Sequence, residues 1–316
     1  MGLFDKLRRK QQGPPVPTAG SDEGSERIKL FDKSGAVISV TKQEYRIKIL
    51  PGMLSAAMED PGRLYTIIVG SLQDGFSADV LEAAEHLHRT DPVPSRSVCA
   101  YGIALMKNGR LDDAERIFLA HIEKHGEDGA VLTNLAKIYS ERGETDKSHT
   151  TLWHALEVDP NTESALTWFA ALAHERAGKK AMEEAWRRVA TLPGSWRAQL
   201  WLARTALETH DREAALAYYR QSLARVGDNV PADFLMQMSG DLGKHGLLSE
   251  LIELSEPPFV PAVHGLQAGN NLIRANVGLG RIDSARRILN QLRLMQRPDW
   301  ASQLDFWEAE IAKHSR

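Results

Sequence analysis

Apolar residues from position 61 onward recur with the spacing of amphipathic helices, and the helices come in pairs. Around the stretch NLAKIYSERG, the large apolar residues Leu132, Leu135 and Tyr139 lie eleven, eight and four positions before Gly143. This spacing is the 3.6-residue period of a helix with one buried face. Gly143 marks a turn, and the second helix that follows it is expected to end at Pro160.

The same pattern repeats along the chain at a nearly constant interval. The predicted turns follow one another after 34, 34, 34, 33, 36 and 34 residues. They fall at Gly75, Gly109, Gly143, Ala177 (with Gly178 as an extra residue), His210, Gly246 and Gly280. Seven positions before the turn the residues are Ile68, Gly102, Ala136, Ala170, Ala203, Ser239 and Ile273. Most of these are small, which lets two antiparallel helices approach closely, and the fixed period indicates stacked hairpins rather than one compact core.

The 34-residue period, the small residue before the aromatic in NLAKIYSERG and the closing ALEVDP resemble the tetratricopeptide repeat (TPR) family, including bacterial proteins built this way. The resemblance covers residues 61–298, with units starting near 61, 95, 129, 163, 196, 232 and 266. It implies an all-α fold, a right-handed α-solenoid of about seven helix–turn–helix units. An amphipathic helix at 299–316 is expected to cap the exposed apolar end of the stack.

The first 60 residues do not follow the repeat. Residues 1–26 are rich in Pro, Gly, Ser and acidic residues after a short basic start, which predicts a flexible tail and linker. Residues 27–60 are predicted to form a small β-hairpin and a short helix. The hairpin follows from alternating apolar and polar residues over 28–40, on either side of an Asp-Lys-Ser-Gly turn.

Thr41 and Glu44 have the spacing of a capping box, which predicts a short helix over 42–50. Pro51 is expected to end that helix, because proline disrupts a helix interior. A strand remains possible here, since apolar residues alternate at Tyr45, Ile47 and Ile49.

The resemblance implies a concave groove that is lined by the first helix of each unit and binds an extended peptide. Asparagine can both donate to and accept from a peptide backbone, arginine and lysine suit carboxylates, and exposed tryptophan anchors partners. A tryptophan on a repeat helix is, however, more often a packing residue than a contact. The candidate groove residues are Asn134, Lys137, Trp168, Arg197, Trp201, Arg204, Asn271 and Arg274.

Asn134 matches the asparagine of the family's clamp for chain-terminal carboxylates. The lysine expected just before it is replaced by Thr133. We therefore expect an extended or acidic segment of another protein as the ligand, rather than a chain terminus.

Composition narrows the functional classes. The net charge of −3 gives no overall case for nucleic-acid binding, and the single Cys99 excludes an internal disulfide framework. His121 and His125 have a spacing that could share a metal, but no third ligand accompanies them. No nucleophile–base set and no phosphate loop is visible. We expect no catalytic residue, no cofactor, no metal and no enzymatic activity.

No apolar run is long enough to cross a membrane, and none follows the basic start as a secretory signal would require, so a cytoplasmic location is expected. The sequence thus predicts a non-enzymatic scaffold or adaptor that binds other proteins. The alternative is an accessory subunit of an enzyme or of a membrane-surface assembly, docked through residues 1–10. Membrane contact is expected only through that segment.

Overall fold

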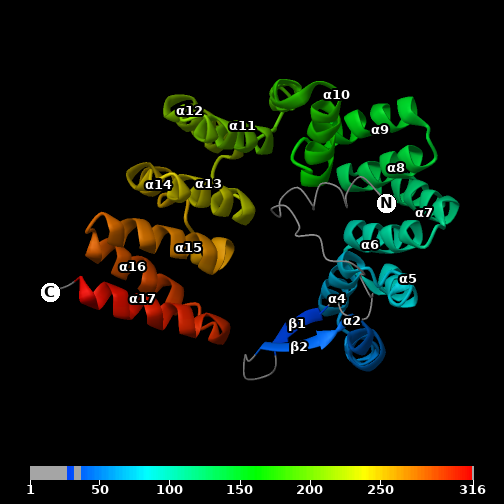
Figure 1. The fold of residues 1–316 in the computed structure, drawn as a ribbon, viewed down its shortest axis with the longest axis horizontal. Helices are drawn as coiled ribbons and strands as arrows, with labels where there is room; N and C mark the ends of the chain where they lie inside the picture. Colours follow the sequence, from blue (N-terminus) through cyan, green and yellow to red (C-terminus); the bar gives the residue numbers. More distant parts are fainter. Residues whose placement is uncertain (1–26, 32–36, 315–316) are drawn as a thin grey trace, which may run out of the picture. The chain divides into compact units, whose positions relative to one another are not determined.

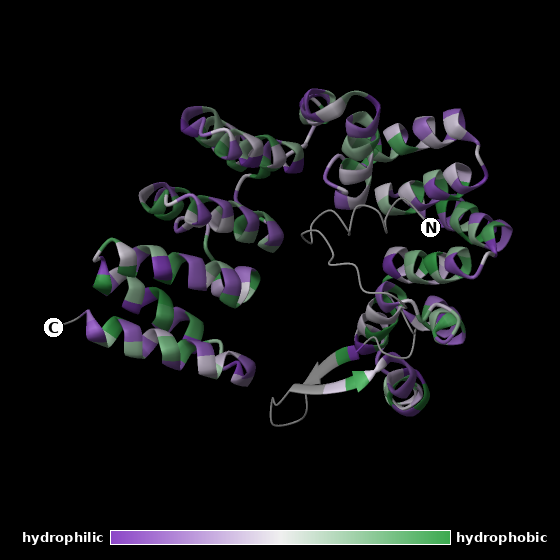
Figure 2. Cartoon of the chain, in the orientation of Figure 1, coloured by the Kyte–Doolittle hydropathy of each residue, from purple (hydrophilic) through white to green (hydrophobic). Residues whose placement is uncertain are grey.

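The computed structural model describes residues 27–31 and 37–314; the predicted tail and linker at 1–26 and the hairpin turn lie outside them. The described residues divide into two compact units, one up to Ile117 and one from Phe118 onward. Most described residues of both units are helical, and Figure 2 shows hydrophobic and hydrophilic residues interleaved along each helix.

The first unit begins with the predicted β-hairpin. Strand β1 (Arg27–Phe31) pairs antiparallel with β2 (Val37–Thr41), and Ile28 lies opposite Val40. Three short helical segments follow, and then four longer helices, the last of which contains the boundary between the two units (Figure 1). These elements are α2 (Lys42–Glu44), η1 (Tyr45–Ile49), α3 (Leu50–Ser55), α4 (Pro61–Asp74), α5 (Leu81–Thr90), α6 (Pro94–Lys107) and α7 (Leu111–His125).

The predicted capping box is present, but the predicted end of its helix is wrong. The Glu44 backbone N–H donates to Thr41 Oγ1 and the Thr41 N–H donates to Glu44 Oε2, both at 3.1 Å. The chain then stays helical to Ser55, because residues 45–49 form a π-helical turn in which the Leu50 N–H reaches back to the Tyr45 carbonyl. Pro51 falls in the first turn of α3, where its missing N–H is tolerated. The strand alternative for this segment is therefore wrong as well.

The second unit consists of successive helix pairs and a terminal helix (Figure 1). After the end of α7 its elements are α8 (Gly129–Glu141), α9 (Thr145–Val158), α10 (Glu163–Ala190), α11 (Arg197–Glu208), α12 (Arg212–Val226), α13 (Ala232–Lys244), α14 (Leu248–Ser255), α15 (Pro261–Gly278), α16 (Ile282–Arg293), η2 (Pro298–Trp300) and α17 (Ala301–Lys313). The prediction of an all-α fold of tandem helix–turn–helix units, with a hairpin before them and a helix after them, is confirmed. The right-handed course of the whole array stays a prediction.

Two long helices contain a break. In α10 the backbone leaves helical geometry at Ala177 and Gly178, so this segment is itself a helical hairpin. The positive φ of +75° belongs to Gly178, which corrects the predicted turn at Ala177 by one residue. In α15 the break lies at Gly265, also with positive φ.

The turns require a left-handed residue. Glycine supplies it at low cost in most hairpins, as at Gly143 with a φ of +78°. In the α11–α12 hairpin the position is occupied by His210 with a φ of +62°. A side chain disfavours this conformation, so this turn is more strained than the glycine turns.

Small residues let the paired helices pack closely. Ala136 on α8 and Ser148 on α9 are both buried, and the Ser148 hydroxyl donates to the Ala136 carbonyl at 2.8 Å. On α15, a Cβ placed on Gly269 would lie 2.6 Å from the Leu292 Cδ1 of α16. A side chain at this position would force Leu292, which is fully buried, to move.

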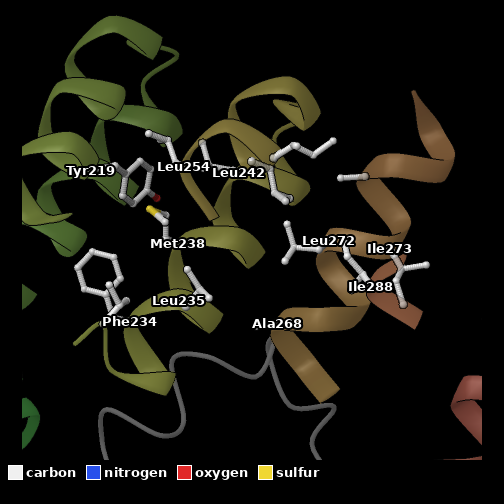
Figure 3. Close-up of a cluster of buried hydrophobic side chains, with 14 of the residues drawn as sticks. Tyr219, Phe234, Leu235, Met238, Leu242, Leu254, Ala268, Leu272, Ile273 and Ile288 are labelled. Carbon is white, nitrogen blue, oxygen red and sulfur yellow. The ribbon is translucent and has the colours of Figure 1, made fainter. Parts of the chain in front are cut away.

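Apolar side chains from successive hairpins of the second unit merge into one core. Tyr219, Phe234, Met238 and Leu272 are fully buried and come from α12, α13 and α15 (Figure 3). The core continues to the last helix, where Leu304, Trp307 and Ile311 turn inward. Helix α17 therefore covers the apolar end of this core, as expected for a cap.

We predict that Gly269→Ala destabilises the protein, because the new methyl group overpacks the α15–α16 contact at a cost of about 1–3 kcal/mol. The measurement is the urea midpoint of the full chain, followed by circular dichroism. Gly70→Ala is the matched control, because Gly70 is helical and a Cβ there meets no atom within 4 Å. It is expected to be neutral or to stabilise by up to about 1 kcal/mol. Equal midpoints for the two variants would contradict the close approach.

Candidate peptide-binding surface

All eight candidate groove residues lie on first helices of hairpins in the second unit. Asn134 and Lys137 are on α8, Trp168 is on α10, Arg197, Trp201 and Arg204 are on α11, and Asn271 and Arg274 are on α15. These helices contact their successors: α8 packs on α10, α10 on α11, α11 on α13 and α13 on α15. The candidates therefore belong to one continuous row of helices.

The Asn134 side chain is engaged within its own helix. It is buried, and its Nδ2 donates to the Ala130 carbonyl at 3.0 Å. Its Oδ1 accepts from Lys137 Nζ at 3.3 Å. Both ends of the amide are thus satisfied without a ligand, and a clamp by Asn134 on a peptide backbone would first have to break these bonds.

The tryptophans pack among themselves and their neighbours. Trp168 is 5% exposed, so its indole lies inside the fold. Trp201 is partly buried and stacks on Trp186 of α10, with ring centroids 5.5 Å apart and planes 15° apart. The buried indole N–H groups of Trp168, Trp186 and Trp201 have no acceptor among the described residues. Trp186 was not recognised from the sequence, because it lies outside the first-helix register.

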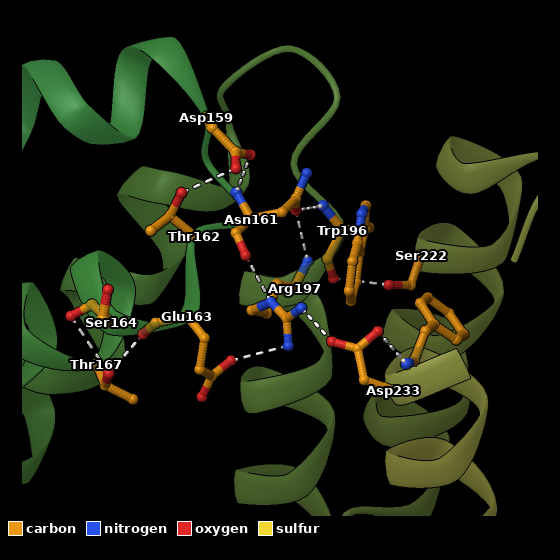
Figure 4. Close-up of polar contacts among 11 residues, drawn as sticks. Asp159, Asn161, Thr162, Glu163, Ser164, Thr167, Trp196, Arg197, Ser222 and Asp233 are labelled. Atoms are coloured by element: carbon orange, nitrogen blue, oxygen red, sulfur yellow. Dashed lines mark hydrogen bonds and ion pairs between the residues drawn. The ribbon is translucent and has the colours of Figure 1, made fainter. Parts of the chain in front are cut away.

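Arg197 is the centre of a polar network that joins three hairpins (Figure 4). Its Nε donates to the Asn161 carbonyl at 2.7 Å, and its Nη1 donates to Glu163 Oε2 at 2.9 Å. Its Nη2 pairs with Asp233 of α13. The side chain is 13% exposed, and each of its three nitrogens has an acceptor inside the protein.

The side chain of Asn161, in the turn before α10, caps the N-terminus of helix α11. Its Oδ1 accepts from the backbone N–H groups of Trp196 at 2.8 Å and Arg197 at 3.0 Å, which would otherwise be free at the start of α11 (Figure 4). Asp159 orients this turn by accepting from the Asn161 N–H at 2.9 Å. The Asp-Pro-Asn-Thr turn chemistry was visible in the sequence, but a capping partner 35 residues away was not.

Arg204 is held on one edge only. Its Nε donates to both carboxylate oxygens of Asp241 on α13, at 3.1 and 3.0 Å. Its guanidinium carbon lies 4.8 Å from the centroid of the Trp201 ring. The hydroxyl of buried Tyr219 donates to Asp241 at 3.4 Å, and burial raises the pKa of that phenol, which keeps it a neutral donor. Asp241 and Tyr219 were not identified from the sequence.

The remaining two candidates, Asn271 and Arg274, lie in different surroundings. Asn271 Nδ2 donates to Ser239 Oγ of α13 at 2.9 Å, which is another contact between successive first helices. Arg274 is exposed. It is one turn away from Asn271 on the same helix.

No group of three or more side chains able to hold a metal occurs in the part of the chain that the structure describes. His121 is buried and its ring lies 4.8 Å from that of His125, but this pair has no third ligand of that kind. Among the described residues, no helix is both long and apolar enough for a membrane crossing.

The fold defines the class of protein: the described helices form tandem hairpins of the TPR-like kind. Solved structures that match it include a tetratricopeptide repeat protein from Parabacteroides merdae, with 13% identity and a TM-score of 0.33 over 82% of this chain and all of that one. Yeast Tom70 matches with 14% identity and a TM-score of 0.46, over 85% of this chain and 58% of its own, so the chain spans less than two thirds of that protein. PilF of Pseudomonas aeruginosa matches with 17% identity and a TM-score of 0.36, over 68% of this chain and 96% of that one.

No protein-family model matches the sequence, and no curated protein sequence matches it. The identities and TM-scores of the structural matches are low, so they describe a similarity of construction. The assignment of helical repeats rests on the helix pairs themselves.

We predict that Arg197→Met lowers stability by about 1–3 kcal/mol, because a mostly buried arginine with charged hydrogen bonds is removed from between three hairpins. The urea midpoint of the full chain measures this. Arg187→Met is the matched control. Among the described residues Arg187 pairs only with Glu183, one turn away at 3.3 Å on the surface, and such a pair contributes about 0.5 kcal/mol or less. If Arg197→Met shifts the midpoint no further than the control does, Arg197 does not join the hairpins.

His154 provides a pH-dependent contact between α9 and the loop before α8. Its Nε2 lies 2.8 Å from Glu127 Oε1, and this hydrogen bond is the main reason that its pKa is raised; Glu157 at 3.6 Å adds to the effect. Because the folded pKa lies above the unfolded one, the stabilisation is complete below the unfolded pKa and is lost as pH rises through the folded value.

We predict that Glu127→Gln lowers the pKa of His154 in an NMR titration of the histidine side chains. Glu157→Gln should lower it less, because that carboxylate is farther away. An unchanged His154 titration in Glu127→Gln would show that the Glu127 contact is not formed in solution.

Proposed function

We propose that the chain is a non-enzymatic scaffold or adaptor that binds an extended segment of another protein along the first helices of its second unit. Tandem helical hairpins present a pre-formed surface, so a partner can be bound with little ordering cost on the receptor side. The observation that carries the proposal is the row α8, α10, α11, α13 and α15, in which each first helix packs on the next.

The character of this row suits a peptide better than a small substrate. It combines partly exposed aromatic and cationic groups, such as Trp201 and Arg204, with exposed Met236 and Arg274 further along. Aromatic residues, methionine and arginine are enriched in protein interfaces. Protein-binding roles of similar repeat proteins, such as the Cut9–Hcn1 hetero-tetramer named for one solved match, fit the same proposal.

The test is a fluorescence-anisotropy screen of the full chain against a library of labelled extended peptides. Arg274→Glu is expected to weaken the binders several-fold, because it reverses an exposed charge on the first-helix row. Lys180→Glu is the matched control, since Lys180 is exposed on the second half of α10. It makes the same charge change outside the row and should leave affinity unchanged. A library without binders, or an equal loss in both variants, would refute the proposed surface.

A further inference from the structure

Building on the proposed function, we infer that Arg204 selects the ligand at the middle of this surface, and that it takes a single Asp or Glu side chain of the partner. The sequence offers several cations on the first helices as equals. The structure separates them by what their nitrogens already bind.

Arg197 has little capacity left for a ligand, because all three nitrogens already have acceptors and the side chain is only 13% exposed. Its Nε, Nη1 and Nη2 are each engaged, by Asn161, Glu163 and Asp233. Lys137 is bound to Asn134. Arg197 therefore joins neighbouring hairpins, whereas Lys137 is engaged within its own helix and has no rigid support from another hairpin in the contact described.

Arg204 combines a fixed orientation with free donors. Only its Nε has an acceptor among the described residues, which leaves the N–H groups of Nη1 and Nη2 without one. The side chain is 33% exposed, so these groups are reachable from solvent. Asp241 holds one edge of the guanidinium and the Trp201 ring lies against it, so the free edge is held in place before a ligand arrives.

The support behind Arg204 is itself rigid. Asp241 is 13% exposed and accepts from buried Tyr219, while Trp201 stacks on Trp186. A planar fork with two parallel N–H donors matches the two oxygens of a carboxylate. Because the side chain is already ordered, little rotamer entropy is lost when the ligand binds.

The same geometry limits the charge of the ligand. Asp241 offsets the charge of Arg204, and Glu163 with Asp233 offsets that of Arg197, so there is no excess of positive charge among these five residues. A run of acidic residues would meet these carboxylates. The chemistry therefore favours a ligand with one carboxylate, next to apolar residues that contact Trp201. Of the two ligands that the sequence predicted, an extended segment or an acidic one, it favours the first.

The experiment uses three versions of each peptide that the library screen yields: one with a single glutamate, one with glutamine in its place, and one with a run of glutamates. Anisotropy titrations compare the unmodified chain with Arg204→Gln and Arg204→Lys. Lysine keeps the charge beside Asp241 but lacks the fork. Thermal unfolding confirms that each variant is folded.

The unmodified chain should bind the glutamate peptide about tenfold more tightly than the glutamine peptide. In Arg204→Gln this preference should disappear. Combining Arg204→Gln in the protein with glutamine in the peptide should then reduce the affinity no more than either change alone. Arg204→Lys should lose most of the preference while its affinity for the glutamine peptide stays the same. The acidic-run peptide should bind no more tightly than the single-glutamate peptide.

The inference is overturned if the glutamine peptide binds as well as the glutamate peptide, if the preference survives in Arg204→Gln, or if affinity grows with each added glutamate. In all three cases peptides still bind, so the proposed function stands while the role of Arg204 falls. A screen without any binder defeats the proposed function first, and this inference with it.

Discussion

The second unit depends on the burial of one apolar stripe from each helix against the hairpin one repeat further along. Leu235 and Met238 of α13, for example, lie in one core with Tyr219 of the preceding hairpin and Leu272 of the next. Hydrophobic packing is non-directional, so it does not by itself fix the distance and angle between two helices. Small residues at the contact do so, because they set how closely the helices approach. Ala136, paired with Ser148, and Gly269 supply that closeness.

A constant packing distance has a consequence for the polar residues. Equivalent positions of neighbouring hairpins face each other, so polar partners are about one period apart in sequence. Arg197 meets Glu163 and Asp233 at separations of 34 and 36 residues, and Arg204 meets Asp241 at 37. The charged residues on the first helices are thus drawn into contacts between repeats, and their number alone says little about what the surface binds.

The fold could be predicted from the sequence because its signals are local and repeated. They are the spacing of apolar residues within each helix, the glycine at the turn, and the recurrence of both about every 34 residues. The prediction erred where one local rule displaced another, as where the π turn at residues 45–49 carries the helix past Pro51, or where Gly178 rather than Ala177 adopts the left-handed turn. The eight surface candidates were placed on the intended helices. Their partners were not foreseeable, since whether Arg197 meets Asp233 depends on side chains from another hairpin.

Arg204 and Arg197 lie two turns apart on one helix, have the same chemistry and both pair with carboxylates of α13. What separates them is the number of acceptors within reach: three groups surround Arg197, whereas Arg204 has one carboxylate on its Nε edge and an aromatic ring against its face. An aromatic face orients a guanidinium without using its N–H donors. Because Trp201 stands where Arg197 has a further acceptor, the Arg204 side chain stays ordered while its Nη1 and Nη2 groups remain available. A surface whose charged residues mostly stabilise the contacts between repeats can in this way keep one oriented donor group for a partner.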